Sequence, residues 1–416
     1  MKKVWMRCTP LLLLLSMLVN IAGCGGQKYQ ASDLMEGITA QPVEAKAAPE
    51  TFEESQMAFA LELFQKTVGA SEEKNVLLSP LSVMLALSMT ANGADGETKA
   101  QMEDVLGLPI EELNVYLYGY VRAITANASY MLNISNSIWF RNQLNVKKDF
   151  LQANADYYGA DAFGSEFDND TVQAMNKWVE EKTNGVIKNM VEKLEPQDVM
   201  CLINTILFEA KWTSAFESNR IGEQTFTPLV GSVQKVMTMS SDESRYIEDN
   251  MATGFIKPFK GDRYSMAILL PNKGVNVKDY IAQLTPEGLL GTLRNVKRTT
   301  VVTRLPKFSY EFSWNMNDVL KGMGMENAFG NTANFNKMAE LQKGDYLYIG
   351  NVMHKTKIQV DELGTVAGAS TSVSMQMESI IPNQKYVLVD RPFVYMIIDN
   401  NTNLPLFMGV VTSING

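Results

Sequence analysis

Helical patterns dominate the first half of this 416-residue chain, and strand patterns dominate the second half. Near the start, Met57, Leu61 and Phe64 recur every three or four residues and so share one face of a helix. Apolar runs typical of strands follow at residues 134–140, 201–208, 265–271, 299–308, 355–362, 385–399 and 404–411. The two patterns do not alternate strictly, as they would in a doubly wound fold, so their order predicts a single mixed α+β domain.

Residues 1–23 have the features of an export signal. Basic residues within the first seven positions precede an apolar run at 11–19, which is too short to cross a bilayer. The run leads into IAGC, ending at Cys24, which is similar to the cleavage site of bacterial lipoproteins. We therefore expect an exported protein of the bacterial cell envelope or surface, held at the membrane only by a lipid on Cys24. Release from the cell, or an ordinary cleavage site that happens to precede a cysteine, are the alternatives.

The exported chain would be acidic and free of disulfides. Loss of three basic residues with the signal lowers the formal charge by three, from −9 to −12. Nucleic acid requires a basic surface, so it is excluded as a partner. Cys8 is lost with the signal and Cys24 would be lipidated, which leaves only Cys201, in an apolar run. Stability must then come from packing alone.

The segment after the signal lacks any apolar period. Residues 24–50 contain Gly, Ala, Pro and charged side chains, a composition typical of linkers. We interpret them as a lipidated cysteine followed by a flexible tether, and residues 51–416 as the folded domain.

His354 is the only histidine, and this excludes many enzymes. Zinc sites built from His and Cys need several ligands, so we expect no metal and no cofactor. The chain has no GxSxG elbow, P-loop or GxGxxG motif in a suitable context. A serine hydrolase would need His354 as its base. Its surroundings, MHKTKIQV, are typical of a strand interior and favour a structural hydrogen bond.

The segment 361–382, DELGTVAGASTSVSMQMESIIP, has the composition of a loop and the pattern of a strand. Every second position from 365 to 377 holds Thr, Ala, Ala, Thr, Val, Met and Met, whereas the intervening positions from 368 hold Gly, Ser, Ser, Ser and Gln. This period of two indicates a strand with one apolar and one polar face.

Six stretches resemble the serpin family, in the same order and at similar spacing. They are NVLLSPLSVMLALSMTANGADGET (75–98), NKWVEEKTNGVI (176–187), LINTILFEAKWTSAF (202–216), LPKFSYEF (305–312), VMHKTKIQVDELGT (352–365) and DRPFVYMIIDNNTNLPLFMGVV (390–411). The resemblance covers residues 51–416. It implies a single α+β domain of three β-sheets and eight or nine helices, with an exposed reactive loop at about 362–382 near the C-terminus.

The resemblance also implies a function that is not enzymatic. Serpins act as suicide substrates: a serine protease attacks the loop and forms an acyl-enzyme, and the cleaved loop then inserts as a new central strand of the large sheet. The protease is dragged away and its catalytic groups lose their geometry. The implied partner is a target serine protease, held covalently by a monomeric inhibitor.

Matching positions give expected roles to individual residues. The hinge of the loop would comprise Glu362, Gly364, Thr365, Ala367 and Ala369. A polar cluster beneath the middle of the large sheet would comprise Ser82, Asn204 and His354. A second cluster, where the loop enters at the top of the sheet, would comprise Trp212, Lys307 and Glu362. The hinge departs from the usual pattern at Val366, Gly368 and Ser370, which the alternation places on the polar face.

The usual hinge length places the cleaved bond between Glu378 and Ser379, with Met377 and Met375 as alternatives. Glu378 would suit an acid-specific protease, and the methionines would suit elastase-like or chymotrypsin-like enzymes. A trypsin-like target is disfavoured because no Lys or Arg lies between 361 and 384.

Two other functions remain as alternatives. A non-inhibitory serpin that serves as a binding protein usually carries bulk, charge or proline in the hinge, and Gly364 to Ser374 contain none of these. A hydrolase based on His354 is the alternative from another class.

Overall fold

A six-stranded sheet extends along the molecule in this computed structural model, which describes residues 29–46, 48–72, 74–126, 130–342, 346–365 and 384–415. Its strands, in spatial order, are β1 (Ser32–Asp33), β5 (Asp161–Ser165), β3 (Met131–Arg141), β6 (Met200–Glu209), β14 (Asn351–Val360) and β12 (Phe308–Asn315).

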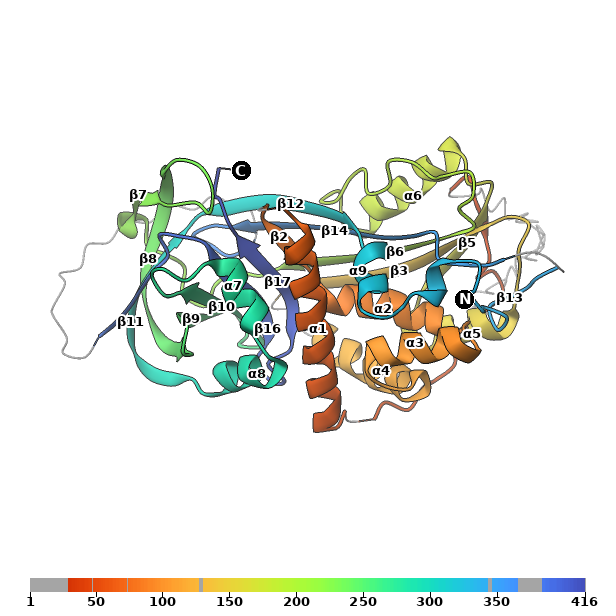
Figure 1. Cartoon of the computed structure of the whole chain (residues 1–416), viewed down its shortest axis with the longest axis horizontal. Coiled ribbons are helices and arrows are strands. Elements are labelled where there is room, and N and C mark those ends of the chain that lie inside the picture. The colour runs from red at the N-terminus through yellow and green to blue at the C-terminus, as the bar shows by residue number, and fades with distance from the viewer. Residues whose placement is uncertain are drawn as a thin grey trace, which may run out of the picture.

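A nine-stranded sheet packs beside the first (Figure 1). Its order is β15 (Lys385–Leu388), β11 (Lys297–Pro306), β8 (Gln234–Glu248), β9 (Ala252–Pro258), β10 (Tyr264–Pro271), β16 (Phe393–Asp399), β17 (Pro405–Val411) and β2 (Val76–Leu78), and β7 (Ile221–Phe226) pairs with β8. A third, two-stranded sheet joins β13 (Ala339–Glu340) to β4 (Asn145–Val146).

Nine α-helices occur among the described residues. They are α1 (Glu50–Ala70), α2 (Pro80–Ala91), α3 (Gly96–Leu106), α4 (Ile110–Thr125), α5 (Lys148–Tyr158), α6 (Asn169–Lys182), α7 (Val277–Gln283), α8 (Pro286–Arg294) and α9 (Asn317–Gly322). Two short 3-10 turns lie at Ser218–Arg220 and Asn327–Phe329. The predicted α+β fold with three sheets and eight or nine helices is confirmed.

Helix α2 is buried along its whole length between the two large sheets, where it contacts β6 and β17. Its start is encoded locally, because the Ser79 hydroxyl accepts a hydrogen bond from the Ser82 N–H at 3.3 Å and Pro80 occupies the first turn. The helix therefore presents Ser82 to the underside of the six-stranded sheet.

Helix α6 covers the opposite face of that sheet, over β3, β5 and β6 (Figure 1). Met175, Trp178 and Val179 of the helix belong to one apolar cluster with Trp139 and Cys201 of the strands. Burial raises the pKa of the Cys201 thiol to about 12, so it stays protonated and serves as a small apolar side chain.

The interpretation of residues 24–50 as a flexible tether is wrong for residues 29–46. Strand β1 pairs antiparallel with β5, with Ser32 opposite Gly164. Tyr29 is buried, and its ring meets the edges of Phe163 and Trp139 with centroid separations of 5.4 and 6.5 Å. A two-residue strand carries no readable period, so the sequence pattern could not indicate this docking.

Candidate functional site

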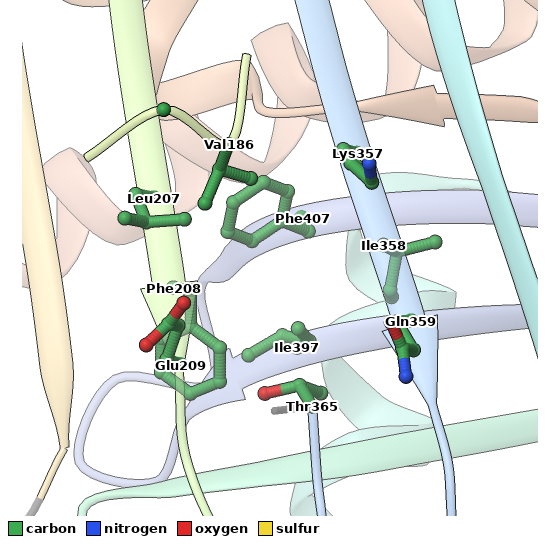
Figure 2. A pocket seen from close by; sticks show the side chains of 11 residues that line it. Val186, Leu207, Phe208, Glu209, Lys357, Ile358, Gln359, Thr365, Ile397 and Phe407 are labelled. Atoms are coloured by element: carbon green, nitrogen blue, oxygen red, sulfur yellow. The ribbon is translucent and has the colours of Figure 1, made fainter. Parts of the chain in front are cut away.

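The six-stranded sheet is open between its two central strands. Strands β6 and β14 pair in parallel only at one end, where Asn351–Met353 lie opposite Cys201–Ile203. Beyond this point the strands separate around a cavity of about 240 Å³. Figure 2 shows Leu207 to Glu209 of β6 on one side and Lys357 to Gln359 of β14 on the other, with Thr365 at the mouth.

The floor of this cavity is apolar. Ile397 and Phe407, from β16 and β17 of the second sheet, line it together with Phe208 (Figure 2). Unpaired backbone edges above an apolar floor make a site that an extended peptide strand can fill, because the strand gains ladder hydrogen bonds on both sides and buries one face.

Thr365 already makes contact with the edge of β6. Its N–H donates to the Ala210 carbonyl at 2.9 Å, and its hydroxyl accepts from the Ala210 N–H at 3.1 Å. The preceding residue, Gly364, forms an isolated antiparallel bridge with Lys211. The predicted hinge residues Gly364 and Thr365 therefore occupy the opening.

Glycine is required at position 364 for two reasons. Its φ of +155° lies in a region that L side chains rarely adopt. A Cβ there would also lie 2.1 Å from the Ala210 carbonyl oxygen, far inside contact distance.

Three hydrogen bonds hold the carbonyls that precede the bridge. The Trp212 N–H donates to the Leu363 carbonyl at 2.8 Å and its indole N–H donates to the Asp361 carbonyl at 2.9 Å. The Phe216 N–H donates to the Glu362 carbonyl at 2.9 Å. We call these three bonds the hinge clamp.

The cluster expected at the top of the sheet contains an ion pair between Lys307 and Glu362. The Lys307 ammonium donates to the Glu362 carboxylate, and this contact lowers the pKa of Glu362 below its ordinary value. Both side chains are 31% exposed, so the pair has limited value for stability. Trp212, Lys307 and Glu362 are thus brought together as the sequence predicted.

The predicted polar cluster also forms beneath the sheet. The Ser82 hydroxyl of α2 donates to the Asn204 side-chain carbonyl, and the Asn204 amide donates to Asn136 of β3. His354 lies in the same region, where its Nε2 accepts a hydrogen bond from the Ser79 N–H at 3.1 Å. The imidazole is buried, and this desolvation lowers its pKa to about 4, so it is neutral at physiological pH.

Three contributing residues had not been singled out from the sequence. Asn136 completes the polar cluster, and its signal was a polar side chain within the apolar run 134–140. Phe216 belongs to the hinge clamp through its backbone, which leaves no side-chain signal. Lys257 packs against the rings of Phe216 and Trp212. A single lysine in a strand pattern does not indicate that its side chain is buried.

Other expectations lie outside the described residues. They are the downstream hinge residues Ala367 and Ala369, the reactive-bond candidates Met375, Met377, Glu378 and Ser379, and the lipidated Cys24. Within the described ranges, no group of three or more His, Cys, Asp or Glu side chains is placed to hold a metal ion. None of the helices described there combines the length and apolarity needed to cross a membrane.

Comparisons with known proteins agree with this geometry. A family model described as serpin (serine protease inhibitor) matches residues 54–414. An uncharacterized serpin-like protein of Thermococcus kodakarensis is 30% identical, over 97% of this chain and 98% of the relative. Neuroserpin of Homo sapiens is 28% identical, over 89% of this chain and 93% of its own length.

Among solved structures, the thermophilic serpin tengpin appears in two states. Its native state is 46% identical and superposes with a TM-score of 0.89, covering 92% of this chain and all of the tengpin chain. Its latent state gives a lower TM-score of 0.78, at 41% identity over 89% of this chain and all of the other. Thyroxine-binding globulin, at 23% identity and a TM-score of 0.78, shares the fold.

Proposed function

The chain belongs to the serpin family of serine protease inhibitors, and from this premise we propose that it traps extracellular serine proteases as a suicide substrate. Cleavage of the loop frees its upstream arm, which enters the opening between β6 and β14 while the protease is still bound as an acyl-enzyme. The protease is carried along, and deacylation stalls when its catalytic groups lose their alignment.

The register of the Gly364 bridge is the observation that carries this proposal. Gly364 lies antiparallel to Lys211, so continued pairing would set each later loop residue opposite the preceding residue of β6. Ala367, Ala369, Thr371 and Val373 would then lie opposite Phe208, Ile206, Asn204 and Leu202.

That register matches the chemistry of the two faces. Phe208, Ile206 and Leu202 belong to the main apolar core, and Asn204 bonds to Ser82 of α2 on the same side. Gly368, Ser370 and Ser372 would lie opposite Leu207, Thr205 and Ile203, on the face toward α6 and solvent. The small apolar face of the loop would therefore enter the core, and its polar face would stay outside.

The experiment that tests insertion compares two arginine variants at adjacent positions. Thr365→Arg places a charge on the entering face, which must be desolvated during insertion. We expect this variant to be cleaved as a substrate without forming a complex that survives denaturing electrophoresis. Val366→Arg is the matched control, because the same register would place position 366 on the outer face, and it should retain the stable complex. Equal trapping by the Thr365→Arg variant would exclude loop insertion as the mechanism.

We propose that the target is an acid-specific serine protease or one with an apolar pocket. Glu378 would fit the first kind, and Met377 or Met375 the second. Mass spectrometry of the C-terminal peptide released by a panel of serine proteases identifies the bond directly. A peptide that begins at Ser379 supports Glu378 as the recognised residue. A peptide that begins at Glu378 supports Met377, one that begins at Met377 supports Gln376, and one that begins at Gln376 supports Met375.

We propose in addition that the protein is exported and anchored through Cys24. The signal-like residues 1–23 and the IAGC sequence support this. The test is membrane fractionation of a Cys24→Ser variant, which should appear in the soluble fraction if the cysteine carries the lipid.

A further inference from the structure

Lys257 is a buried cation close to the hinge. It lies on β9, and its side chain is only 3% exposed. Its Nζ lies 2.7 Å from Oε1 of Glu243 on β8, whose side chain is 9% exposed. The same carboxylate oxygen also accepts a hydrogen bond of 2.6 Å from the Ser241 hydroxyl. Both charges have therefore lost most of their water and depend on each other.

The Lys257 ammonium also lies against two aromatic rings. It is 4.2 Å from the centroid of the Phe216 ring and 5.6 Å from that of Trp212. Trp212 is in turn stacked on Phe259, with 4.4 Å between centroids and 9° between the ring planes. A cation over a ring face attracts it, and the attraction is stronger where water is excluded. Lys257 thus fixes both rings from one side.

These two rings belong to the residues that form the hinge clamp. Trp212 supplies two of the three hydrogen bonds to the carbonyls of residues 361–363, and Phe216 supplies the third. Each donor residue therefore also contacts the buried ammonium through its own ring. A shift of either ring would be transmitted to the carbonyl that its own residue holds.

Global stability does not account for such a pair. Desolvation of two charges usually offsets their attraction, and well-packed apolar replacements of similar volume are often neutral or stabilising. What an apolar pair cannot supply is a cation that holds two ring faces at defined positions. The pair is therefore distinguished by the geometry that it imposes on Trp212 and Phe216.

We propose that Lys257 and Glu243 are positioning residues that hold the hinge clamp and so set the rate at which the loop enters the sheet. Glu243 holds the ammonium in place through their 2.7 Å contact, and the ammonium orients the two clamp residues. This inference rests on the proposed function and extends it to a pair outside the hinge itself.

The test replaces both charges by apolar side chains of similar size, as Lys257→Met combined with Glu243→Leu. Replacing one alone would leave an unpaired buried charge and destabilise the whole protein. Hydrogen exchange of the Trp212 and Phe216 amides should become faster by on the order of tenfold. In the wild type, local opening must break the contacts between the rings and the ammonium, and the double variant lacks these contacts. The midpoint of global unfolding should not fall.

A matched control removes an exposed ion pair from the neighbouring strands. Lys235 and Glu223 pair across β7 and β8 with side chains 76% and 58% exposed, so Lys235→Met combined with Glu223→Gln should leave exchange of the clamp amides unchanged.

Two outcomes would overturn the proposal. One is unchanged exchange of the Trp212 and Phe216 amides in the apolar double variant. The other is faster exchange of all protected amides together with a lower unfolding midpoint, which would assign the pair to general stability. Hydrogen exchange is measured without a protease, so it tests the role of Lys257 and Glu243 independently of inhibition. A wild-type protein that forms no protease complex would contradict the proposed function but not this result.

In the expected case, a second measurement links the clamp to insertion. Native protein is incubated at a fixed temperature, and the fraction that has lost the ability to form a protease complex is followed with time. The apolar double variant should lose it several-fold faster than the Lys235 and Glu223 control, because a looser clamp releases the hinge more often. Equal rates of loss in the two variants would mean that Lys257 does not affect loop insertion, and would overturn that part of the inference.

Discussion

His354 accepts a hydrogen bond from a backbone amide in a buried polar cluster, and its burial keeps the imidazole neutral. Its side chain has almost no contact with solvent, and burial lowers its pKa to about 4. A base in a hydrolase must reach the substrate, which such burial prevents. The geometry therefore favours the structural role that the surrounding strand pattern predicted.

The depressed pKa of His354 predicts a pH dependence of stability. The unfolded state binds a proton near pH 6.5 and the folded state only near pH 4, so stability should fall as the pH is lowered between these values. The loss is about 1.4 kcal/mol per pH unit in that window. Denaturant unfolding between pH 7 and 5 should show this slope in the wild type and lack it in His354→Gln.

Because His354 is the only histidine, the comparison has no background from other imidazoles. Most carboxylates titrate below pH 5, outside the range measured. Equal pH slopes for the two proteins would mean that folding does not lower the pKa of His354.

Gly364 provides a second prediction at this scale. In Gly364→Ala, the new Cβ would meet the Ala210 carbonyl oxygen, so the bridge to Lys211 must open. Strain of this kind costs roughly 1–3 kcal/mol. We expect faster hydrogen exchange of the Thr365 amide and slower trapping of a protease.

The matched control for this variant is Gly222→Ala on β7, where a Cβ would have no neighbour within 4 Å and φ is not positive. It should leave both measurements unchanged. Unaltered exchange of the Thr365 amide in Gly364→Ala would contradict the geometry of the bridge.

At the scale of elements, the N-terminal strand β1 closes one edge of the six-stranded sheet. Its register with β5 and the burial of Tyr29 make residues 29–33 part of the fold. The Tyr29 hydroxyl also donates to Glu181 of α6 at 2.8 Å. The segment thus links the sheet edge to the helix that covers it.

Tyr29→Ala tests this packing. Deleting a buried aromatic side chain of this size should lower the free energy of unfolding by roughly 3 kcal/mol. Tyr386→Ala is a suitable control, since that ring is 61% exposed and its loss should change stability by less than about 0.5 kcal/mol. Denaturant titration measures both. A Tyr29→Ala variant as stable as the control would restore the interpretation of this segment as a tether.

The sequence predicted the large elements and the hinge but not the short ones. The long apolar run at 201–208 indicated β6, because periodicity is a local signal. The two faces that the alternation predicts for the loop lie on residues 366–377, outside the described residues. Strand β1 could not be predicted because it has only two residues. The burial of Lys257 could not be predicted because it depends on Glu243, fourteen residues away, and on the rings of Trp212 and Phe216, which lie in the segment after β6. Such contacts are set by tertiary packing alone.

At the scale of the whole molecule, the described fold leaves backbone edges of β6 and β14 without strand partners. Loop insertion would convert these edges into paired ones and bury one face of the loop. Each internal hydrogen bond contributes about 1 kcal/mol net, so filling the opening would be strongly stabilising.

Proteolysis in the loop should therefore raise the thermal unfolding midpoint, by on the order of 20 °C. The experiment cleaves the purified protein with a protease that cuts between 374 and 380, then compares cleaved and intact samples by calorimetry. The Thr365→Arg variant serves as the control, because it can be cleaved but should not gain this stability. An unchanged midpoint for cleaved wild-type protein would mean that the opening stays unfilled.

The contact between Lys211 and Gly364 bears on the kinetics of such a change. Pairing of two chain segments is usually limited by nucleation, because the first contact orders many dihedral angles for few bonds, whereas propagation adds a bond for each further residue. Here the first antiparallel contact exists before any cleavage. Entry of the loop would begin from a formed nucleus, and its speed would be limited by how readily β6 and β14 move apart to admit each next residue.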